Sequence, residues 1–126
     1  MPILTDTNYV DNAESAIKKL DRDSRNRNNP NAFKLTTSKI RNLLSLTSSL
    51  YDESKVKEFD QLSDKIAYLR VQYVYQAGRE PAVKDFVTKA DILNALKEVK
   101  DRETLQRFCR YMEALVAYFK FEGGRD

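Results

Sequence analysis

Basic residues gather at a point of the sequence where a helix would aim them at an anion. Lys39 and Arg41 lie within five residues after Thr36 and Thr37, either of which can cap a helix through its hydroxyl. The N-terminus of a helix also presents unpaired backbone N–H groups, which suit phosphate. This combination predicts a phosphate-contact site. The alternative is an ordinary helix cap followed by two solvated cations.

A second cation stands at a predicted corner between two helices. Gly78 suits the left-handed residue that ends one helix, and Pro81 suits the first turn of the next. Arg79 would then be held rigidly in a tight corner, available to an anionic partner. The alternative is that Arg79 caps the preceding carbonyl groups or pairs with Glu80 or Asp85.

Catalytic side chains are scarce. The sequence has no histidine, which removes the commonest general base and metal ligand, and no glycine-rich phosphate loop. Its single cysteine, Cys109, falls in an apolar stripe and is expected to be core. Only the carboxylate pairs Asp21/Asp23 and Asp60/Asp64 leave an enzyme conceivable. We therefore predict no catalytic residues, no metal and no cofactor.

Size and charge set the broad class. A chain of 126 residues suits one domain, and few glycines and prolines with many charged residues favour an all-α fold. The net charge of +3, from 22 basic and 19 acidic residues, permits a polyanionic partner without requiring one. No apolar run is long enough for a membrane span, and no signal peptide is visible, so a soluble cytoplasmic protein is expected.

Apolar periodicity predicts a single-domain bundle of about five helices over residues 1–126. The helices are expected at about 9–21, 38–51, 55–77, 82–99 and 102–121, the fourth with a kink or break near Thr88 and Lys89. Asp101 should cap the last helix, and a turn is expected at 52–54. Residues 22–34 are rich in Arg and Asn and predict a flexible loop, which is either solvated or an arm that contacts a polyanion.

The helix at 55–77 carries two apolar stripes on opposite faces. One consists of Phe59, Leu62, Ile66, Leu69 and Tyr73, and the other of Tyr68, Val71 and Tyr75. A helix that is apolar on two sides usually lies between other helices. We therefore expect a long central helix with both stripes in the core and with Arg70 and Arg79 as its functional residues. Because these two arginines point in roughly opposite directions on an ideal helix, a common contact requires Gly78 to turn the chain.

Three stretches together resemble a known family. They are LTTSKIRNLL (35–44), LRVQYVYQAGRE (69–80) and FCRYMEALVAYFKFEGG (108–124), and they occur in the same order and at similar spacing in the small helical subunit of type III-A CRISPR (Csm) effector complexes, close to the streptococcal members. The resemblance covers nearly the whole chain outside residues 22–34.

The resemblance implies a non-catalytic all-α subunit that acts in antiviral defence. Copies of such a subunit stack beside a filament of backbone subunits that holds the guide RNA, and target RNA pairs with the guide between the two filaments. A large polymerase-like subunit is a further partner. Contacts to RNA are implied for six basic residues of this sequence: Lys39, Arg41, Arg70, Arg79, Arg110 and Lys120.

Two other functions remain open from the sequence. A helical protein–protein adaptor without direct nucleic-acid contact fits the seam-like apolar stripes and the low net charge. A carboxylate-based enzyme would require a clustered acidic pair and a metal-dependent activity.

Overall fold

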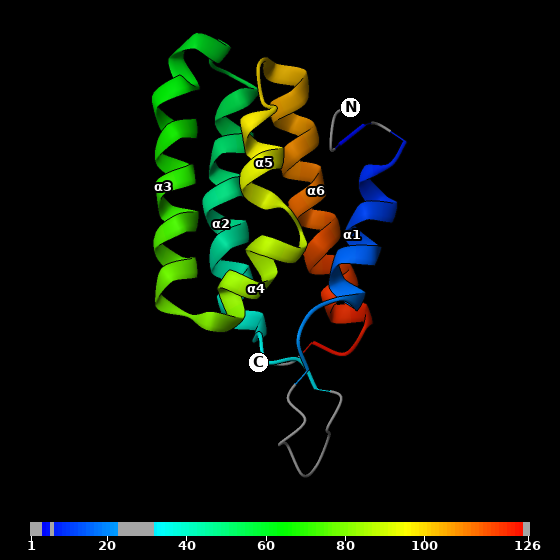
Figure 1. The fold of residues 1–126 in the computed structure, drawn as a ribbon. Helices are drawn as coiled ribbons and strands as arrows, with labels where there is room; N and C mark the ends of the chain where they lie inside the picture. The colour runs from blue at the N-terminus through cyan, green and yellow to red at the C-terminus, as the bar shows by residue number, and fades with distance from the viewer. Residues whose placement is uncertain (1–3, 6, 23–31, 125–126) are drawn as a thin grey trace.

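The computed structural model is a bundle of six α-helices and one short 3-10 helix within its described residues, 4–5, 7–22 and 32–124. Figure 1 shows α3 and α1 at opposite edges, with α2 and α6 between them and α4 and α5 in front. The elements are α1 (Tyr9–Lys18), α2 (Thr37–Ser54), η1 (Phe59–Leu62), α3 (Ser63–Arg79), α4 (Pro81–Lys89), α5 (Ile92–Lys97) and α6 (Arg102–Phe121). The all-α class is thus confirmed.

The longest helix, α6, supplies more buried residues to the core than any other helix. Five of its apolar residues, spaced by three and four positions, are completely buried: Leu105, Phe108, Met112, Leu115 and Phe119. The helix packs against α1 on one side and α2 on the other. Asp101 caps it as predicted, because its carboxylate accepts a 2.8 Å hydrogen bond from the backbone N–H of Thr104.

The break predicted near Thr88 and Lys89 separates α4 from α5. Asp91 has a left-handed backbone conformation, with φ of 55°, and its side chain accepts a 2.8 Å hydrogen bond from Asn94. The buried hydroxyl of Tyr111 donates a 2.7 Å hydrogen bond to the carbonyl oxygen of Ala90. A residue on α6 thus satisfies a carbonyl group at the end of α4 and fixes where the chain turns.

Several boundaries differ from the prediction, and α1 ends at Lys18 rather than near residue 21. Residues 52–54 are the last turn of α2 rather than a turn between helices, and the hydroxyl of the buried Ser54 bonds back to the carbonyl oxygen of Tyr51. Helix α3 begins only at Ser63, because a 3-10 turn occupies Phe59–Leu62. Polar residues at a helix end cannot be told from a turn when their side chains bond within the helix itself.

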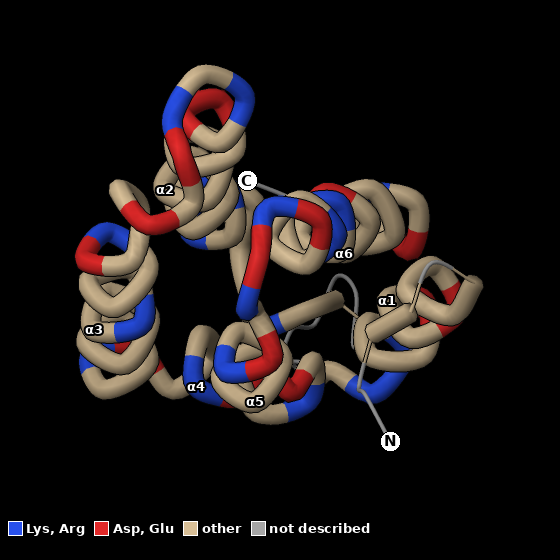
Figure 2. Tube along the Cα trace, turned by 90° about the horizontal axis from the view of Figure 1, so that it is seen from above, with Lys and Arg blue, Asp and Glu red and all other residues tan. Residues whose placement is uncertain are grey.

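The two-sided burial expected for the central helix is wrong. Only Leu69 and Tyr73 of α3 are buried, and Tyr68, Val71 and Tyr75 are each more than half exposed. Seen along the bundle, α3 lies at its periphery, with α2 on one side and α4 and α5 on the other (Figure 2). The first stripe packs inward as predicted, whereas the second faces solvent.

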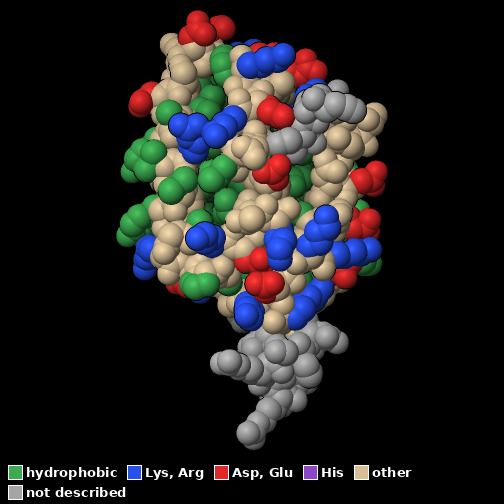
Figure 3. Space-filling view, in the orientation of Figure 1, with side chains coloured by type: hydrophobic (Ala, Val, Ile, Leu, Met, Phe, Trp, Pro, Cys, Tyr) green, Lys and Arg blue, Asp and Glu red, His purple; other side chains and the backbone are tan. Residues whose placement is uncertain are grey.

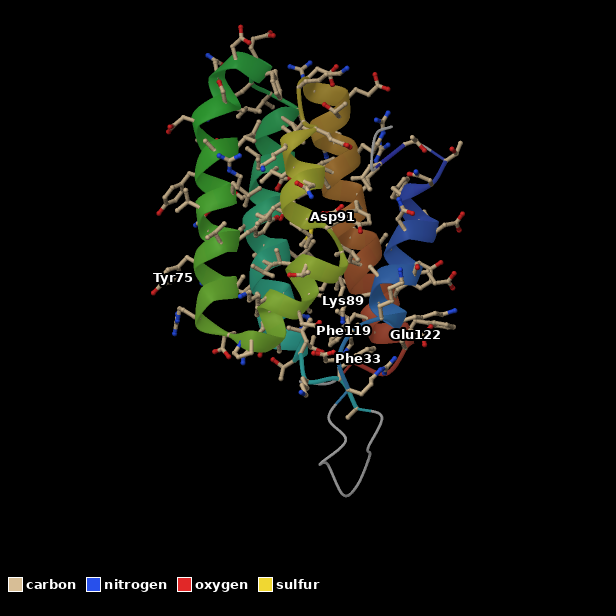
Figure 4. The ribbon with its side chains drawn as sticks, in the orientation of Figure 1. Phe33, Tyr75, Lys89, Asp91, Phe119 and Glu122 are labelled. Carbon is tan, nitrogen blue, oxygen red and sulfur yellow. The ribbon has the colours of Figure 1, made fainter. Side chains whose placement is uncertain are left out.

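The predicted loop at 22–34 is described only at its two ends. Arg22 and Phe33 form an isolated antiparallel bridge, and the Arg22 guanidinium lies 3.7 Å from the centre of the Phe33 ring. The Phe33 ring in turn lies 4.8 Å from that of Phe119, so this end of the predicted loop packs onto the core (Figure 4). The expected flexibility of residues 23–31 lies outside the described residues.

Candidate nucleic-acid interface

The start of α2 and the corner between α3 and α4 meet at one site. Lys39 donates a 2.7 Å hydrogen bond to the carboxylate of Glu80, which lies between Arg79 and Pro81. Around this ion pair is a surface pocket of about 320 Å³, and its polar lining consists of Ser38, Lys39, Asn42, Gln76, Arg79 and Glu80. The structure therefore brings together two of the cations that the sequence singled out.

The ion pair changes how this site can bind an anion. The hydrogen bond and charge of Lys39 hold the pKa of the Glu80 carboxyl below its ordinary value, and the charge of Arg79 acts more weakly in the same direction. Glu80 is therefore ionised at neutral pH and accepts a hydrogen bond from the ammonium group of Lys39. A phosphate that approaches this corner has to compete with Glu80 for Lys39.

The helix start differs in detail from the predicted cap. Thr36 is the N-cap residue and has extended backbone, but its hydroxyl lies 3.2 Å from that of Ser38 and makes no capping bond to the backbone. Thr37 is completely buried. Arg41 is exposed and forms no ion pair within the described part of the chain. It is thus a more accessible cation than Lys39.

Gly78 does not turn the chain, contrary to the prediction. Helix α3 continues through Gly78 to its last residue, Arg79, and is followed by Glu80, whose extended backbone precedes Pro81. Arg70 and Arg79 therefore remain nine residues apart on one regular helix, about half a turn from each other around its axis. A single ligand cannot meet both arginines on one face of α3.

Arg79 lies along the exposed side of α3. Its guanidinium is 5.6 Å from the centre of the Tyr75 ring, within reach of a cation–π contact. Neither of the ion pairs considered for it is present, since Glu80 bonds Lys39 and Asp85 bonds Lys89 at 2.8 Å. Arg79 is exposed and keeps its N–H donors available at the edge of the pocket.

The remaining candidates lie elsewhere on the surface. Arg70 is exposed beside a mainly apolar pocket between α3 and α5, which Lys97 also lines. Arg110 and Lys120 are exposed on α6, and the Lys120 ammonium lies 3.5 Å from the carbonyl oxygen of Gly124. The six basic residues thus form separate groups rather than one patch. Figure 3 likewise shows basic side chains dispersed over the face that it displays.

Sequence reasoning missed two features of these sites. Lys97 joins Arg70 only because α5 folds back along α3, and no local spacing could reveal this. Glu80 was considered only as a partner of the adjacent Arg79, although it pairs with Lys39, which is 41 positions away. Both associations depend on tertiary packing.

The described residues contain no group of three or more His, Cys, Asp or Glu side chains that could hold a metal ion. Burial raises the pKa of the Cys109 thiol to about 12. None of the helices in the described part is both long and apolar enough to cross a membrane.

Comparison with known proteins gives a consistent family. Residues 14–125 match the family described as Csm2 Type III-A. The chain is 68% identical to the CRISPR system Cms protein Csm2 of Streptococcus thermophilus over the full length of both chains. It is 52% identical to the protein of that name from Mycobacterium tuberculosis strain H37Rv, over 76% of this chain and 82% of the relative. For the Enterococcus italicus protein the identity is 41%, over 69% and 67% of the two chains. A match of this extent establishes that the chain belongs to the Csm2 family of type III-A CRISPR systems.

Proposed function

We propose that this protein is the non-catalytic small subunit of a type III-A effector complex and that it holds target RNA, paired with guide RNA, by the phosphate backbone. The observation that carries the proposal is the family match over nearly the whole chain. In addition, each of the three stretches that resemble the family, 35–44, 69–80 and 108–124, contains exposed basic residues. Its partners would be the backbone and large polymerase-like subunits and further copies of itself, in the cytoplasm.

The distribution of cations supports weak, sequence-independent contact. Phosphate contacts give affinity that depends on salt, while base pairing between guide and target supplies specificity. Arg41 and Arg79 are the best placed cations, because both are exposed and neither is occupied by a carboxylate in the described structure. Lys39 would contribute once a phosphate displaces it from Glu80. Several weak contacts suffice when several copies act on one RNA.

Arg70 and Arg79 would not contact the same RNA strand. The two arginines project from opposite sides of α3, so one RNA strand on the Arg79 side does not reach Arg70. Arg110 and Lys120 on α6 are likewise separate from the corner and would require a second RNA contact.

The exposed apolar stripe on α3 favours a protein contact as well. Tyr68, Val71 and Tyr75 offer an aromatic and aliphatic surface that RNA phosphates do not use. An adaptor that binds proteins only is therefore the second candidate function. It differs from the first in predicting that no basic residue affects RNA capture by the assembled complex.

Charge reversal of Arg41 and Arg79 separates these two functions. The double variant Arg41→Glu/Arg79→Glu, in a reconstituted complex, is expected to weaken target-RNA capture. Each lost phosphate contact lowers the slope of log K against log salt by about 0.7 for a single strand. The control is Lys19→Glu/Lys100→Glu, which reverses the charge of two exposed lysines elsewhere on the surface and gives the same net charge. Capture by the Arg41/Arg79 variant equal to that by the control would refute the assignment.

A further inference from the structure

The groove between α3 and α5 combines an apolar lining with two basic residues. Its volume is about 330 Å³, and Arg70 of α3 and Lys97 of α5 are exposed along it. In Figure 3, basic side chains lie beside apolar ones over the space between these two helices. The apolar lining is made mainly by the buried Leu96 and the half-buried Phe59, Ile66 and Val99.

The two cations of this groove have no acidic partner. Neither Arg70 nor Lys97 forms a hydrogen bond or an ion pair within the described part of the chain. Lys39 and Lys89, in contrast, lie 2.7 and 2.8 Å from carboxylate oxygens. Two positive charges beside one apolar groove repel each other, and a carboxylate supplied by a ligand would relieve that repulsion. The charge of the groove is thus complementary to an anionic ligand.

The apolar lining indicates a protein ligand rather than RNA. A phosphate backbone is held by charged and polar groups and leaves apolar side chains uncovered. An unpaired base gains most from stacking on an exposed aromatic ring, whereas Phe59, the aromatic residue that lines the groove, is half-buried. A protein segment, in contrast, can offer an apolar side chain and carboxylates next to it.

We propose that this groove binds an acidic, apolar segment of another protein subunit of the effector complex. A large apolar side chain of that segment fills the space over Leu96 and Ile66, and carboxylates beside it pair with Arg70 and Lys97. Ligand sites have volumes of roughly 300–1,000 Å³, so a groove at the low end of this range accepts an inserted side chain rather than a whole helix. The inference rests on the proposed place of the chain in a complex. It goes beyond that proposal by assigning a protein-contact surface and the chemistry of its partner.

The groove is separate from the corner that contains Lys39 and Arg79. One pocket lies between α3 and α5, and the other lies between α2 and the corner that joins α3 to α4. Arg70 and Arg79 are about half a turn apart around α3. One copy of the chain can therefore contact RNA at the corner and a protein segment in the groove at the same time.

Site-specific photo-cross-linking in a complex reconstituted from purified subunits tests the groove. The photoreactive residue p-benzoylphenylalanine replaces Ser63, which is exposed and lines the groove. Mass spectrometry should identify a cross-linked segment of another subunit in which a large apolar residue is flanked by Asp or Glu. The matched control places the same photoreactive residue at Ser15, which is exposed on α1, and should not capture that segment.

Charge reversal tests the role of the two cations. Arg70→Glu/Lys97→Glu should lower the cross-link yield from position 63 about 3- to 10-fold, the effect of losing two exposed ion pairs. The control Lys19→Glu/Lys84→Glu reverses two exposed lysines that do not line the groove and gives the same net charge. Its yield should equal that of the chain with both cations intact.

Ala67→Glu tests the groove without changing either cation. Ala67 lines the groove three residues before Arg70, so the new carboxylate can pair with Arg70 and compete with those of the partner. The yield should fall as it does on charge reversal. Ala117→Glu adds the same charge at an exposed position of α6 and should leave the yield unchanged. Circular dichroism melting of each variant establishes that the fold is retained.

Several results would overturn the proposal. They are the absence of a cross-link from position 63, a cross-link to RNA or only to a second copy of this chain, a captured segment without Asp or Glu, and equal yields from a groove variant and its control. The variant Arg41→Glu/Arg79→Glu should leave the cross-link yield unchanged while it weakens RNA capture. The protein contact and the RNA contact therefore fail separately.

Discussion

Replacing Glu80 by glutamine is expected to strengthen RNA binding, although it alters no cation. In the free protein the Glu80 carboxylate accepts a 2.7 Å hydrogen bond from Lys39 and lies beside Arg79. An RNA phosphate at this corner must displace that carboxylate, which also repels it. Glutamine keeps the size of the side chain and removes its charge, so Lys39 becomes free to bind phosphate.

The structure sets the size of the effect. The side chains of Lys39 and Glu80 are 38% and 36% exposed, so water screens the pair and its loss should hardly change the melting temperature. One additional phosphate contact on a single strand steepens the salt dependence by about 0.7 per copy. The advantage of Glu80→Gln over wild type should therefore shrink about 2.6-fold between 50 and 200 mM salt.

The assay is fluorescence anisotropy of labelled target RNA with the reconstituted complex, titrated at several salt concentrations. Glu103→Gln is the matched control, because Glu103 is 76% exposed and forms an ion pair with Arg107 at 3.5 Å on α6. It produces the same change in net charge away from the corner. The gain should disappear when Lys39→Gln is added to Glu80→Gln. Equal binding by Glu80→Gln and Glu103→Gln would refute the competition between Glu80 and phosphate.

Two further predictions concern the core. Thr47→Val should cost about 1–3 kcal/mol in the free energy of unfolding, because it leaves the buried hydroxyl of Tyr73 without its hydrogen-bond partner. The double variant Thr47→Val/Tyr73→Phe should be more stable than Thr47→Val alone in urea denaturation, and the opposite order would contradict this account. Cys109, whose pKa burial raises to about 12, should be protonated at pH 8 and react with a thiol reagent only in denaturant. Rapid labelling of the native protein would contradict its assignment to the core.

Much of the fold could be predicted because periodicity identifies the apolar face of a helix. The seam of α6 from Leu105 to Phe119 and the break at Asp91 both follow from spacings within a few residues. The candidate site could be predicted only in part. Lys39 and Arg79 were identified by their local helix-end signals, but their relation to Glu80 depends on how α2 packs against the corner between α3 and α4. No pattern in a single sequence encodes that distance.

The prediction that both stripes of α3 are buried in the bundle was wrong, because an apolar stripe can be covered by another molecule instead of by the same chain. Periodicity indicated correctly that Tyr68, Val71 and Tyr75 share a face with the character of an interface. It could not tell whether the covering partner is another helix of the same chain or another chain, because the two present the same chemistry. The structure excludes the first option for the described residues. A stripe that has the spacing of a core but is exposed in the folded chain is therefore informative, because it identifies the face of α3 around Val71 as a candidate contact surface.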